Sequence, residues 1–398
     1  MNTSKPTCKE QPFNFVYWMS ESRIGLMDSS TLLHVVSFNI PYPPDYGGVI
    51  DVFYKLKSLK EQGVKVILHA FVYDRSPDES LNEYVHEVHY YRRKKGLRYL
   101  FSPLPYIVVT RQSRLLMERL EKDNFPVLFE GLHSCYYLDK LKKKDRKLVV
   151  RTHNIEHNYY RMLARSERNL LRKMYLFAES RKLKRYETIL KTADEVAAIS
   201  TTDHAYFKRT YGISHHISAF HQHTELNAKP GRGEYILFHG NLSVPENEQA
   251  LLYLVDKVLS NVDYPVIIAG KNPGKYVLRK CNSYPNIRII SNPDGTEMQQ
   301  LVANAQINLL YTYQPTGLKL KLLHSLYGGR FCLANPLMVS GSGLEDLCII
   351  YNSPTDAIQK INEYMKLDFT NDVLAVRIDK LQEYANESNV RKLLELIT

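Results

Sequence analysis

The sequence of 398 residues lacks any run of 18 apolar residues, which argues against a helix that crosses a bilayer. Its five cysteines are scattered and include no C-x-x-C pair, so a disulfide framework or a zinc cluster is disfavoured and a reducing cytoplasm is expected. The N-terminus lacks the basic-then-apolar layout of a signal peptide. No DNA- or RNA-binding motif is present, so nucleic acid is not an expected partner.

The composition is globular, with 44% hydrophobic and 24% charged residues, and the length suits two or three domains. The net charge is +11, and basic residues are concentrated in residues 92–95 and 140–147. Such segments fit a solvated face. They equally fit a surface that meets phosphate, in a nucleotide or on an anionic membrane.

Short apolar runs alternate with amphipathic segments, which is typical of parallel βαβ units. The predicted strands are 32–38, 64–72, 127–130, 148–152 and 195–200, then 235–239, 265–269, 286–290, 307–311, 331–334 and 348–351. A long charged helical stretch is predicted over 159–191. The polar segment 224–233 is interpreted as a linker. The fold class is therefore α/β, with two Rossmann-like domains facing a cleft.

These elements divide the chain into four parts. Residues 32–224 and 234–372 form the two domains, and residues 373–398 form a charged helix. Residues 1–31 show no matching pattern and are expected to be an extension. Met27 is a candidate alternative start.

The loop PYPPDYGG follows the first strand and precedes a helix. Gly47 and Gly48 allow a close approach of backbone to a ligand, and the helix N-terminus offers N–H groups to an anion. An ordinary turn is the alternative. G-x-G-x-x-G is absent from the chain, which disfavours a nicotinamide dinucleotide enzyme.

The segment RTHNIEH directly follows the apolar residues 148–150 of a predicted strand and groups Arg151, His153, Asn154, Glu156 and His157. Polar side chains at the carboxyl end of a buried strand indicate a site, and His153 is suited to proton transfer near neutral pH. The histidines and the glutamate are also metal-ligand types, although their spacing is not H-E-x-x-H.

Three turns of the second half are candidates for phosphate contacts. Gly240 and Asn241 follow one strand, and Lys271 follows the next, although each could be a simple βα turn. Gly317 opens a helix whose first turns carry Lys319 and Lys321. Cations there oppose the helix dipole, which is easier to explain if an anion such as a diphosphate also binds.

In this order, the Gly-Gly loop, RTHNIEH, ADEVAAIS, GNLS, AGK and TGLKLKLLHSLYGGRFCLAN resemble the GT-B glycosyltransferases, and within them family 4. The resemblance covers residues 32–364. It implies an N-terminal acceptor domain, a C-terminal sugar-nucleotide domain and a final helix that crosses back onto the first domain. It also implies a retaining sugar transfer without cofactor or metal, consistent with the absence of D-x-D.

The resemblance assigns roles to single residues. Gly47 and Gly48 would lie beside the donor phosphates, His153 near the transferred sugar, and Asn241 where many members carry an arginine. Because the first domain would hold the acceptor, the acceptor-side candidates are Arg151, Asn154 and Glu156.

The chain departs from the family at two positions. Many members carry two glutamates eight positions apart, and Thr316 and His324 occupy those places here. Lys319 or Lys321 would then take over phosphate or donor contacts. The departure leaves a non-catalytic sugar-nucleotide binder as an alternative, and a sugar-nucleotide epimerase or a phosphorylase is a further one.

The resemblance implies a nucleotide sugar as one partner and a glycan or lipid-linked hydroxyl acceptor as the other, in surface polysaccharide assembly. The basic segments of the first domain suit a lipid diphosphate carrier or an anionic membrane face, with peripheral contact.

Overall fold

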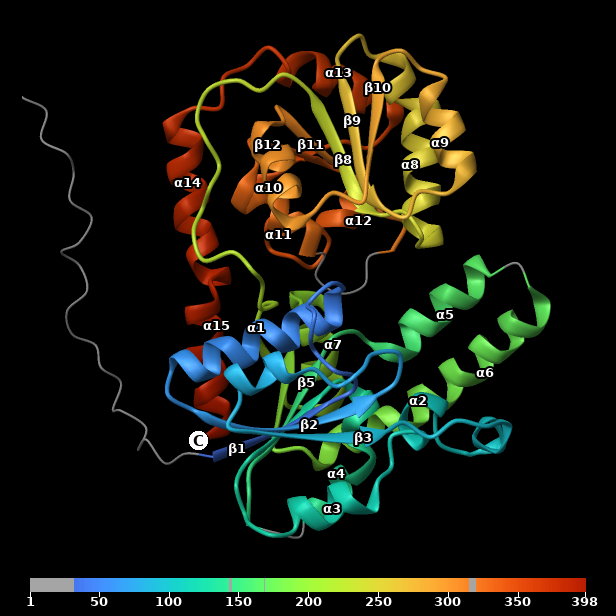
Figure 1. Cartoon of the computed structure of the whole chain (residues 1–398), viewed down its shortest axis with the longest axis vertical. Helices are drawn as coiled ribbons and strands as arrows, with labels where there is room; N and C mark the ends of the chain where they lie inside the picture. Colours follow the sequence, from blue (N-terminus) through green and yellow to red (C-terminus); the bar gives the residue numbers. More distant parts are fainter. Residues whose placement is uncertain (1–31, 143–144, 168, 315–319) are drawn as a thin grey trace, which may run out of the picture.

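The computed structural model of the chain describes residues 32–142, 145–167, 169–314 and 320–398. The predicted extension lies outside these residues. Two parallel α/β domains follow one another along the long axis of the molecule (Figure 1). The expected architecture of two Rossmann-like domains is confirmed.

The first sheet has seven parallel strands in the order β3-β2-β1-β4-β5-β6-β7. They are β1 (Leu32–Ser37), β2 (Lys65–Val72), β3 (Glu87–Arg92), β4 (Val127–Glu130), β5 (Leu148–Thr152), β6 (Glu195–Ala198) and β7 (His215–His216). In the register of the central strands, Val36 lies opposite His69 on β2 and Phe129 on β4. All five residues of β5 are buried, as expected for a central strand of a sheet covered on both faces.

The second sheet has six parallel strands in the order β10-β9-β8-β11-β12-β13. They are β8 (Ile236–Asn241), β9 (Val266–Lys271), β10 (Ile287–Ser291), β11 (Ile307–Leu310), β12 (Phe331–Ala334) and β13 (Ile349–Ile350). Each predicted strand corresponds to an observed one, with ends that differ by at most two residues.

Helices connect the strands. The α-helices are α1 (Gly47–Glu61), α2 (Tyr106–Val109), α3 (Arg114–Leu120), α4 (Leu138–Leu141), α5 (Glu156–Ser166), α6 (Leu170–Tyr186), α7 (Thr201–Tyr211), α8 (Pro245–Lys257), α9 (Lys275–Asn282), α10 (Gly295–Asn304), α11 (Leu320–Gly328), α12 (Pro336–Val339), α13 (Pro354–Tyr364), α14 (Asn371–Leu381) and α15 (Asn386–Ile397). The 3₁₀ turns are η1 (Glu79–Glu83), η2 (Leu97–Phe101), η3 (Leu132–Tyr137), η4 (Glu187–Thr192), η5 (Leu259–Asn261), η6 (Glu345–Leu347) and η7 (Gln382–Tyr384).

The structure differs from the sequence prediction in the first domain. The edge strand β3 is half-exposed and carries no apolar run, and β7 has two residues. Neither therefore shows the apolar run from which the other strands were predicted. The predicted helical stretch 159–191 is a hairpin of α5 and α6. Its second helix begins where the Asn169 side chain accepts a hydrogen bond from the Arg172 N–H at 3.0 Å.

The chain passes from the first domain to the second through residues 217–235 and returns through α14 (Figure 1). The last helix, α15, then lies beside α1 of the first domain. Its Val390, Leu393 and Ile397 join the apolar cluster that includes Leu56 of α1. The C-terminal residues therefore stabilise the first domain.

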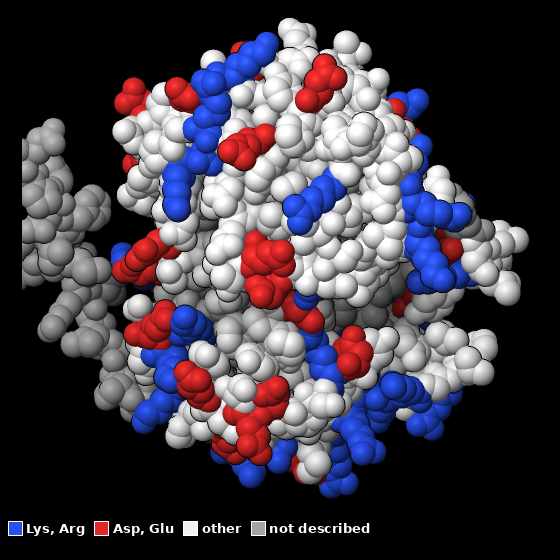
Figure 2. Space-filling view, turned by 45° about the horizontal axis from the view of Figure 1, so that its top comes forward, with Lys and Arg blue, Asp and Glu red and all other residues white. Residues whose placement is uncertain are grey.

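Charge is unevenly distributed over the surface. In the lower part of Figure 2, which belongs to the first domain, Lys and Arg side chains gather on the right, whereas Asp and Glu lie towards the centre and left. Basic side chains are thus denser on one side of this domain in the view shown.

Leu393→Ala tests the packing of α15. Leu393 is fully buried, so the cavity left behind should lower the free energy of unfolding by about 2–5 kcal/mol. Val376→Ala on α14 is the control, because Val376 is 65% exposed and should cost less than about 0.5 kcal/mol. Urea unfolding measures both, and equal midpoints for the two variants would contradict this packing.

Candidate active site

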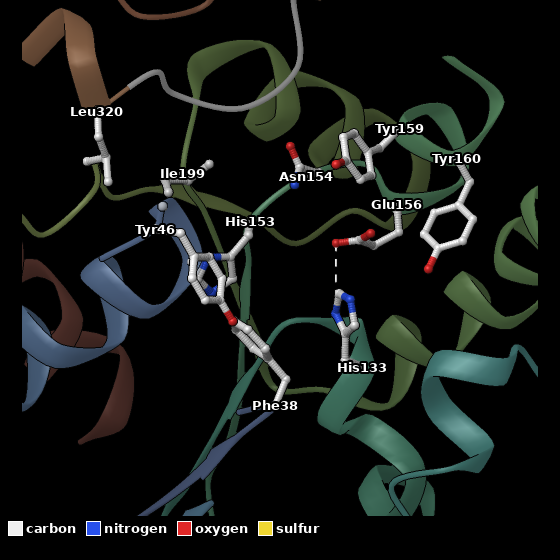
Figure 3. A pocket seen from close by; sticks show the side chains of 12 residues that line it. Phe38, Tyr46, His133, His153, Asn154, Glu156, Tyr159, Tyr160, Ile199 and Leu320 are labelled. Carbon is white, nitrogen blue, oxygen red and sulfur yellow. Dashed lines mark ion pairs between the residues drawn. The ribbon is translucent and has the colours of Figure 1, made fainter. Parts of the chain in front are cut away.

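A cavity of about 310 Å³ lies at the carboxyl ends of the strands of the first sheet, and α11 of the second domain contributes to its wall (Figure 3). Its lining residues are Phe38, Tyr46, Gly47, Gly48, His133, His153, Asn154, Glu156, Tyr159, Tyr160, Ile199 and Leu320. Two sequence segments that are about 100 residues apart, the Gly-Gly loop and RTHNIEH, therefore meet at one site.

Gly47 and Gly48 form the start of α1 at the edge of this cavity. The preceding Tyr46 makes no side-chain capping bond, and the first turn carries no acidic residue. Because the first N–H groups of a helix lack partners within it, this end of α1 is suited to an anion. A Cβ on Gly48 would lie 2.8 Å from Cζ of Phe38, so glycine lets that ring pack under the helix start.

Behind the cavity lies a fully buried network of charges. Lys55 of α1 donates hydrogen bonds to Asp51 at 2.9 Å and to both carboxylate oxygens of Glu130 at 2.7 and 2.8 Å. Burial alone would raise the pKa of Asp51, but Arg151 and Lys55 outweigh burial and lower it. The pKa of Glu130 is likewise lowered against burial, by Lys55 and His153. Both carboxylates are therefore ionised at neutral pH.

This network orients His153. Its Nε2 lies 3.1 Å from Oε2 of Glu130 and 3.9 Å from Oδ2 of Asp51. An ionised carboxylate can only accept, so Nε2 of His153 carries the hydrogen and donates to Glu130. The ring is held between Glu130 and the cavity, beside Phe38, whose ring centroid lies 5.5 Å away.

Arg151 does not line the cavity. Its guanidinium is fully buried, pairs with Asp51 at 3.0 Å and donates to the carbonyls of Ile217 and Ser218. Its position gives no support to the acceptor-side role expected from the sequence. Instead, Arg151 attaches the end of β5 to the segment that leaves the first sheet.

Asp51, Glu130 and His153 also bring three potential metal-ligand atoms within 4.8 Å of one another. The ammonium group of Lys55 already lies between the two carboxylates, within 2.9 Å of each. With Arg151 added, two buried cations balance two buried anions. The arrangement fits a closed salt-bridge network better than a metal site.

Glu156 and His133 face each other at the opposite wall of the cavity, with 3.9 Å between Oε1 and Nδ1 (Figure 3). Burial, together with the nearby Asp203 and Glu187, raises the pKa of Glu156 to about 8. Burial also lowers the pKa of His133 well below its usual value. Both groups are thus predominantly neutral at pH 7. The buried Nδ1 of His133 has no hydrogen-bond partner among the described residues.

Gly240, Asn241 and Lys271 lie at the strand ends of the second sheet and do not line this cavity. Asn241 and Lys271 are neighbours in the register of β8 and β9. The Asn241 side chain accepts hydrogen bonds from Ser243 N and Oγ at 3.1 and 2.7 Å. The lack of a side chain at Gly270 allows the end of β9 to lie close to the end of β8, because a Cβ there would lie 2.4 Å from the Gly240 carbonyl oxygen.

The GLKLK segment is described from Leu320 onward, so Thr316, Gly317 and Lys319 lie outside the described residues. Lys321 Nζ lies 3.3 Å from the Tyr311 carbonyl and 3.4 Å from Asn247 Oδ1, next to the end of β8. Lys321 and the turn at Gly240 and Asn241 are therefore on one side of the second sheet.

His324 is in a different environment from that of a phosphate ligand. Burial lowers its pKa to about 4, so it is neutral at pH 7. Its Nδ1 lies 3.0 Å from Nε2 of His223, a residue of the connection between the domains. His324 is thus part of a group of neutral histidines, together with His223 and His239.

Sequence reasoning missed several residues at the site. Phe38, Tyr46, His133, Tyr159 and Tyr160 line the cavity, and Asp51, Lys55 and Glu130 hold His153. Two signals pointed to the last three: Asp51 and Lys55 are spaced i, i+4 on an otherwise apolar helix face, and Glu130 ends a buried strand.

No protein-family profile matches the chain. An uncharacterized 44.6 kDa protein in the cps region of Klebsiella pneumoniae is 28% identical over 328 residues, which are 78% of this chain and 84% of that protein.

Solved structures share the fold over nearly the whole chain. A glycosyltransferase from Rickettsia africae has a TM-score of 0.61 at 15% identity, over 92% of this chain and 97% of that one. HepE from Anabaena, solved with UDP and glucose, has a TM-score of 0.61 at 11% identity, over 91% of this chain and 98% of that one. A trehalose-phosphate synthase from Burkholderia xenovorans has a TM-score of 0.61 at 9% identity, over 92% of this chain and 99% of that one. The fold is that of the GT-B glycosyltransferases.

Glu156→Gln tests the neutral state of this buried carboxyl. Between pH 4.5 and about 8 the folded wild type keeps a proton that the unfolded chain releases. Its free energy of unfolding should therefore fall by about 1.4 kcal/mol per pH unit across this window. Glutamine has no such proton, so the stability of the variant relative to wild type should rise with pH.

Melting temperatures from pH 5 to pH 9 measure this difference. Glu387→Gln is the matched control, because Glu387 is exposed and pairs with Arg391 on the surface of α15. If Glu156→Gln and Glu387→Gln follow the same pH dependence, Glu156 is not held neutral.

Proposed function

We propose that this chain is a glycosyltransferase of the family 4 type, which transfers a sugar from a nucleoside-diphosphate sugar to a hydroxyl group with retention. The observation that carries the proposal is the cavity that joins the start of α1 to His153 within a GT-B fold. The fold relative HepE was solved with UDP and glucose, which supports this donor class. The related protein in a cps region supports a setting in polysaccharide assembly.

The main chemical demand of this reaction is the departure of a diphosphate, which requires positive charge in a partly dry cleft. The start of α1 at Gly47 and Gly48 offers backbone N–H groups from one side. From the other domain, Lys321 and Lys271 supply ammonium groups near the turn at Gly240. Asn241, Thr316, Gly317 and Lys319 complete the proposed phosphate region, without a resident metal or other cofactor.

His153 is the proposed catalytic residue nearest the transferred sugar. Its Nε2–H donates to Glu130. A bound sugar would therefore contact the other ring nitrogen and the ring edge. Holding the ring by a carboxylate fixes its orientation before the donor binds. Such preorganisation is the usual source of transition-state stabilisation in enzymes.

Glu156, Asn154 and His133 form the proposed acceptor side. A hydroxyl group placed beside Glu156 and His133, whose Oε1 and Nδ1 lie 3.9 Å apart, would accept from the protonated carboxyl and donate to Nδ1 of His133. Neutral groups there would recognise a hydroxyl without attracting a second phosphate.

A non-catalytic sugar-nucleotide binder is the second candidate. It is favoured by one observation: the position of a family glutamate holds His324, which is buried and neutral and contacts His223. Binding without turnover would separate this candidate from the transferase. An epimerase would instead convert the donor sugar without releasing nucleoside diphosphate.

The first test is a panel of UDP-, GDP- and ADP-linked sugars, each measured in a chelator for thermal stabilisation and for slow release of nucleoside diphosphate. One donor at 100 times its Kd should stabilise the fold by about 2.7 kcal/mol. His153→Ala should keep this stabilisation but lower release at least about tenfold. His215→Ala is the control, because its side chain is exposed on β7. No shift with any donor or free nucleoside diphosphate would refute the proposal.

Lys319→Ala tests stabilisation of the leaving group. If its ammonium contacts the departing diphosphate, turnover at saturating acceptor should fall at least about tenfold, with a smaller effect on KM. Lys257→Ala is the control, since Lys257 is exposed at the end of α8. Unchanged turnover in Lys319→Ala would remove this residue from that role.

A further inference from the structure

Two neighbouring segments of the first domain expose apolar side chains. One is the arm, defined as helices α5 and α6. The other is the loop, defined as residues 92–106 between β3 and α2. At the start of α6, Leu170 is 70% exposed, Leu171 78% and Met174 62%. In the loop, Leu97 is 76% exposed and Phe101 88%. Such grouping of large apolar side chains in water marks an interaction site.

The same segments are strongly basic. The two helices of the arm carry eight Lys and Arg residues and two acidic ones, and the loop carries five basic residues and no acidic one. The acidic side chains do not offset this charge on the surface, because Glu156 and Glu179 are buried and Glu167 pairs with Arg172. The exposed basic residues are Arg92, Lys94, Lys95, Arg98, Arg165, Arg172, Arg181, Lys184 and Arg185.

Direct contacts hold the arm and the loop together. Lys182 of α6 donates a hydrogen bond to the Leu100 carbonyl at 2.7 Å. The Tyr106 N–H donates to the buried carboxylate of Glu179 at 2.6 Å. Both segments project from the same side of the first domain, on the right in Figure 1. Lys and Arg also gather on the lower right in Figure 2.

We propose that the arm and the loop form a membrane-docking surface that binds the headgroups of anionic lipids and inserts Leu, Met and Phe side chains among the acyl chains. A basic surface with exposed apolar residues is complementary to the interface of an anionic bilayer. A nucleic acid would satisfy the charge but leave Leu170, Leu171 and Met174 in water. No described helix is long and apolar enough to cross a membrane, so the contact is peripheral.

The position of this surface relative to the cavity adds a consequence that rests on the proposed function. Helix α5 begins at the cavity with Glu156, Tyr159 and Tyr160 and extends from there to the tip of the arm. Docking through the arm would therefore bring the acceptor side of the cavity towards the membrane. An acceptor hydroxyl carried on a lipid would be presented there.

Co-sedimentation of the full chain with vesicles tests the docking surface. The vesicles are phosphatidylcholine alone or phosphatidylcholine with 30% phosphatidylglycerol. We expect binding to the anionic vesicles that weakens as salt is raised. The variant Leu170→Ser/Leu171→Ser/Met174→Ser and the variant Arg172→Glu/Lys173→Glu should each bind at least about tenfold more weakly.

The matched control is Val373→Ser/Val376→Ser/Ile378→Ser on α14. These side chains are 41%, 65% and 43% exposed, and α14 carries as many acidic as basic residues. It lies on the opposite side of the molecule (Figure 1). The control should bind vesicles like wild type. Light scattering and melting temperatures of all variants report self-association and folding.

Three outcomes would overturn the docking surface. Wild type could stay in the supernatant with anionic vesicles, or the arm variants could bind as well as the α14 control. The arm variants could also dissociate a dimer while vesicle binding stays unchanged, which would assign the surface to a second copy of the chain. Donor-induced thermal stabilisation, measured on the same samples, reports the proposed transferase separately.

Discussion

A buried network of four charges sets the geometry of the first domain. Asp51 and Lys55 of α1, Glu130 of β4 and Arg151 of β5 are all fully buried and bonded to one another. Asp51 also accepts the Phe220 N–H at 2.9 Å, which fixes the segment that leaves the sheet. Removing one member would leave a buried charge without its partner, at a cost of about 3–5 kcal/mol.

The position of the cavity follows from this network. Because Asp51 lies one turn and Lys55 two turns after Gly47 and Gly48, their salt bridges to β4 and β5 determine where the start of α1 lies. The same Glu130 holds His153. The helix end proposed to bind an anion and the oriented imidazole are thus fixed by one set of interactions, so the proposed site is preorganised by the core of the domain rather than by surface loops.

The sequence predicted the fold well because parallel strands buried on both faces are continuous apolar runs. Only β3 and β7 were not predicted, because β3 is largely polar and β7 is very short. It also predicted which segments meet, since loops after parallel strands gather at one edge. The partners of Arg151 were not predictable. Asp51 lies 100 residues away, and a buried arginine and an exposed one look alike in a sequence. The neutral state of His324 was not predictable either, because it results from burial, which a sequence does not show.

The charge around the cavity limits how the proposed reaction can work. Glu156, His133 and His324 are neutral at pH 7, and the charges of Asp51, Glu130, Lys55 and Arg151 cancel within their own network. Arg111, whose Nε donates to the Phe38 carbonyl at 2.8 Å, is a buried cation beside the cavity. We expect the remaining charge that stabilises a departing diphosphate to come from the helix ends and from the lysines of the second domain. Lys271 and Lys321 belong to the second domain, so the approach of the two domains would itself assemble the positive site. A donor would bind tightly only to that closed arrangement.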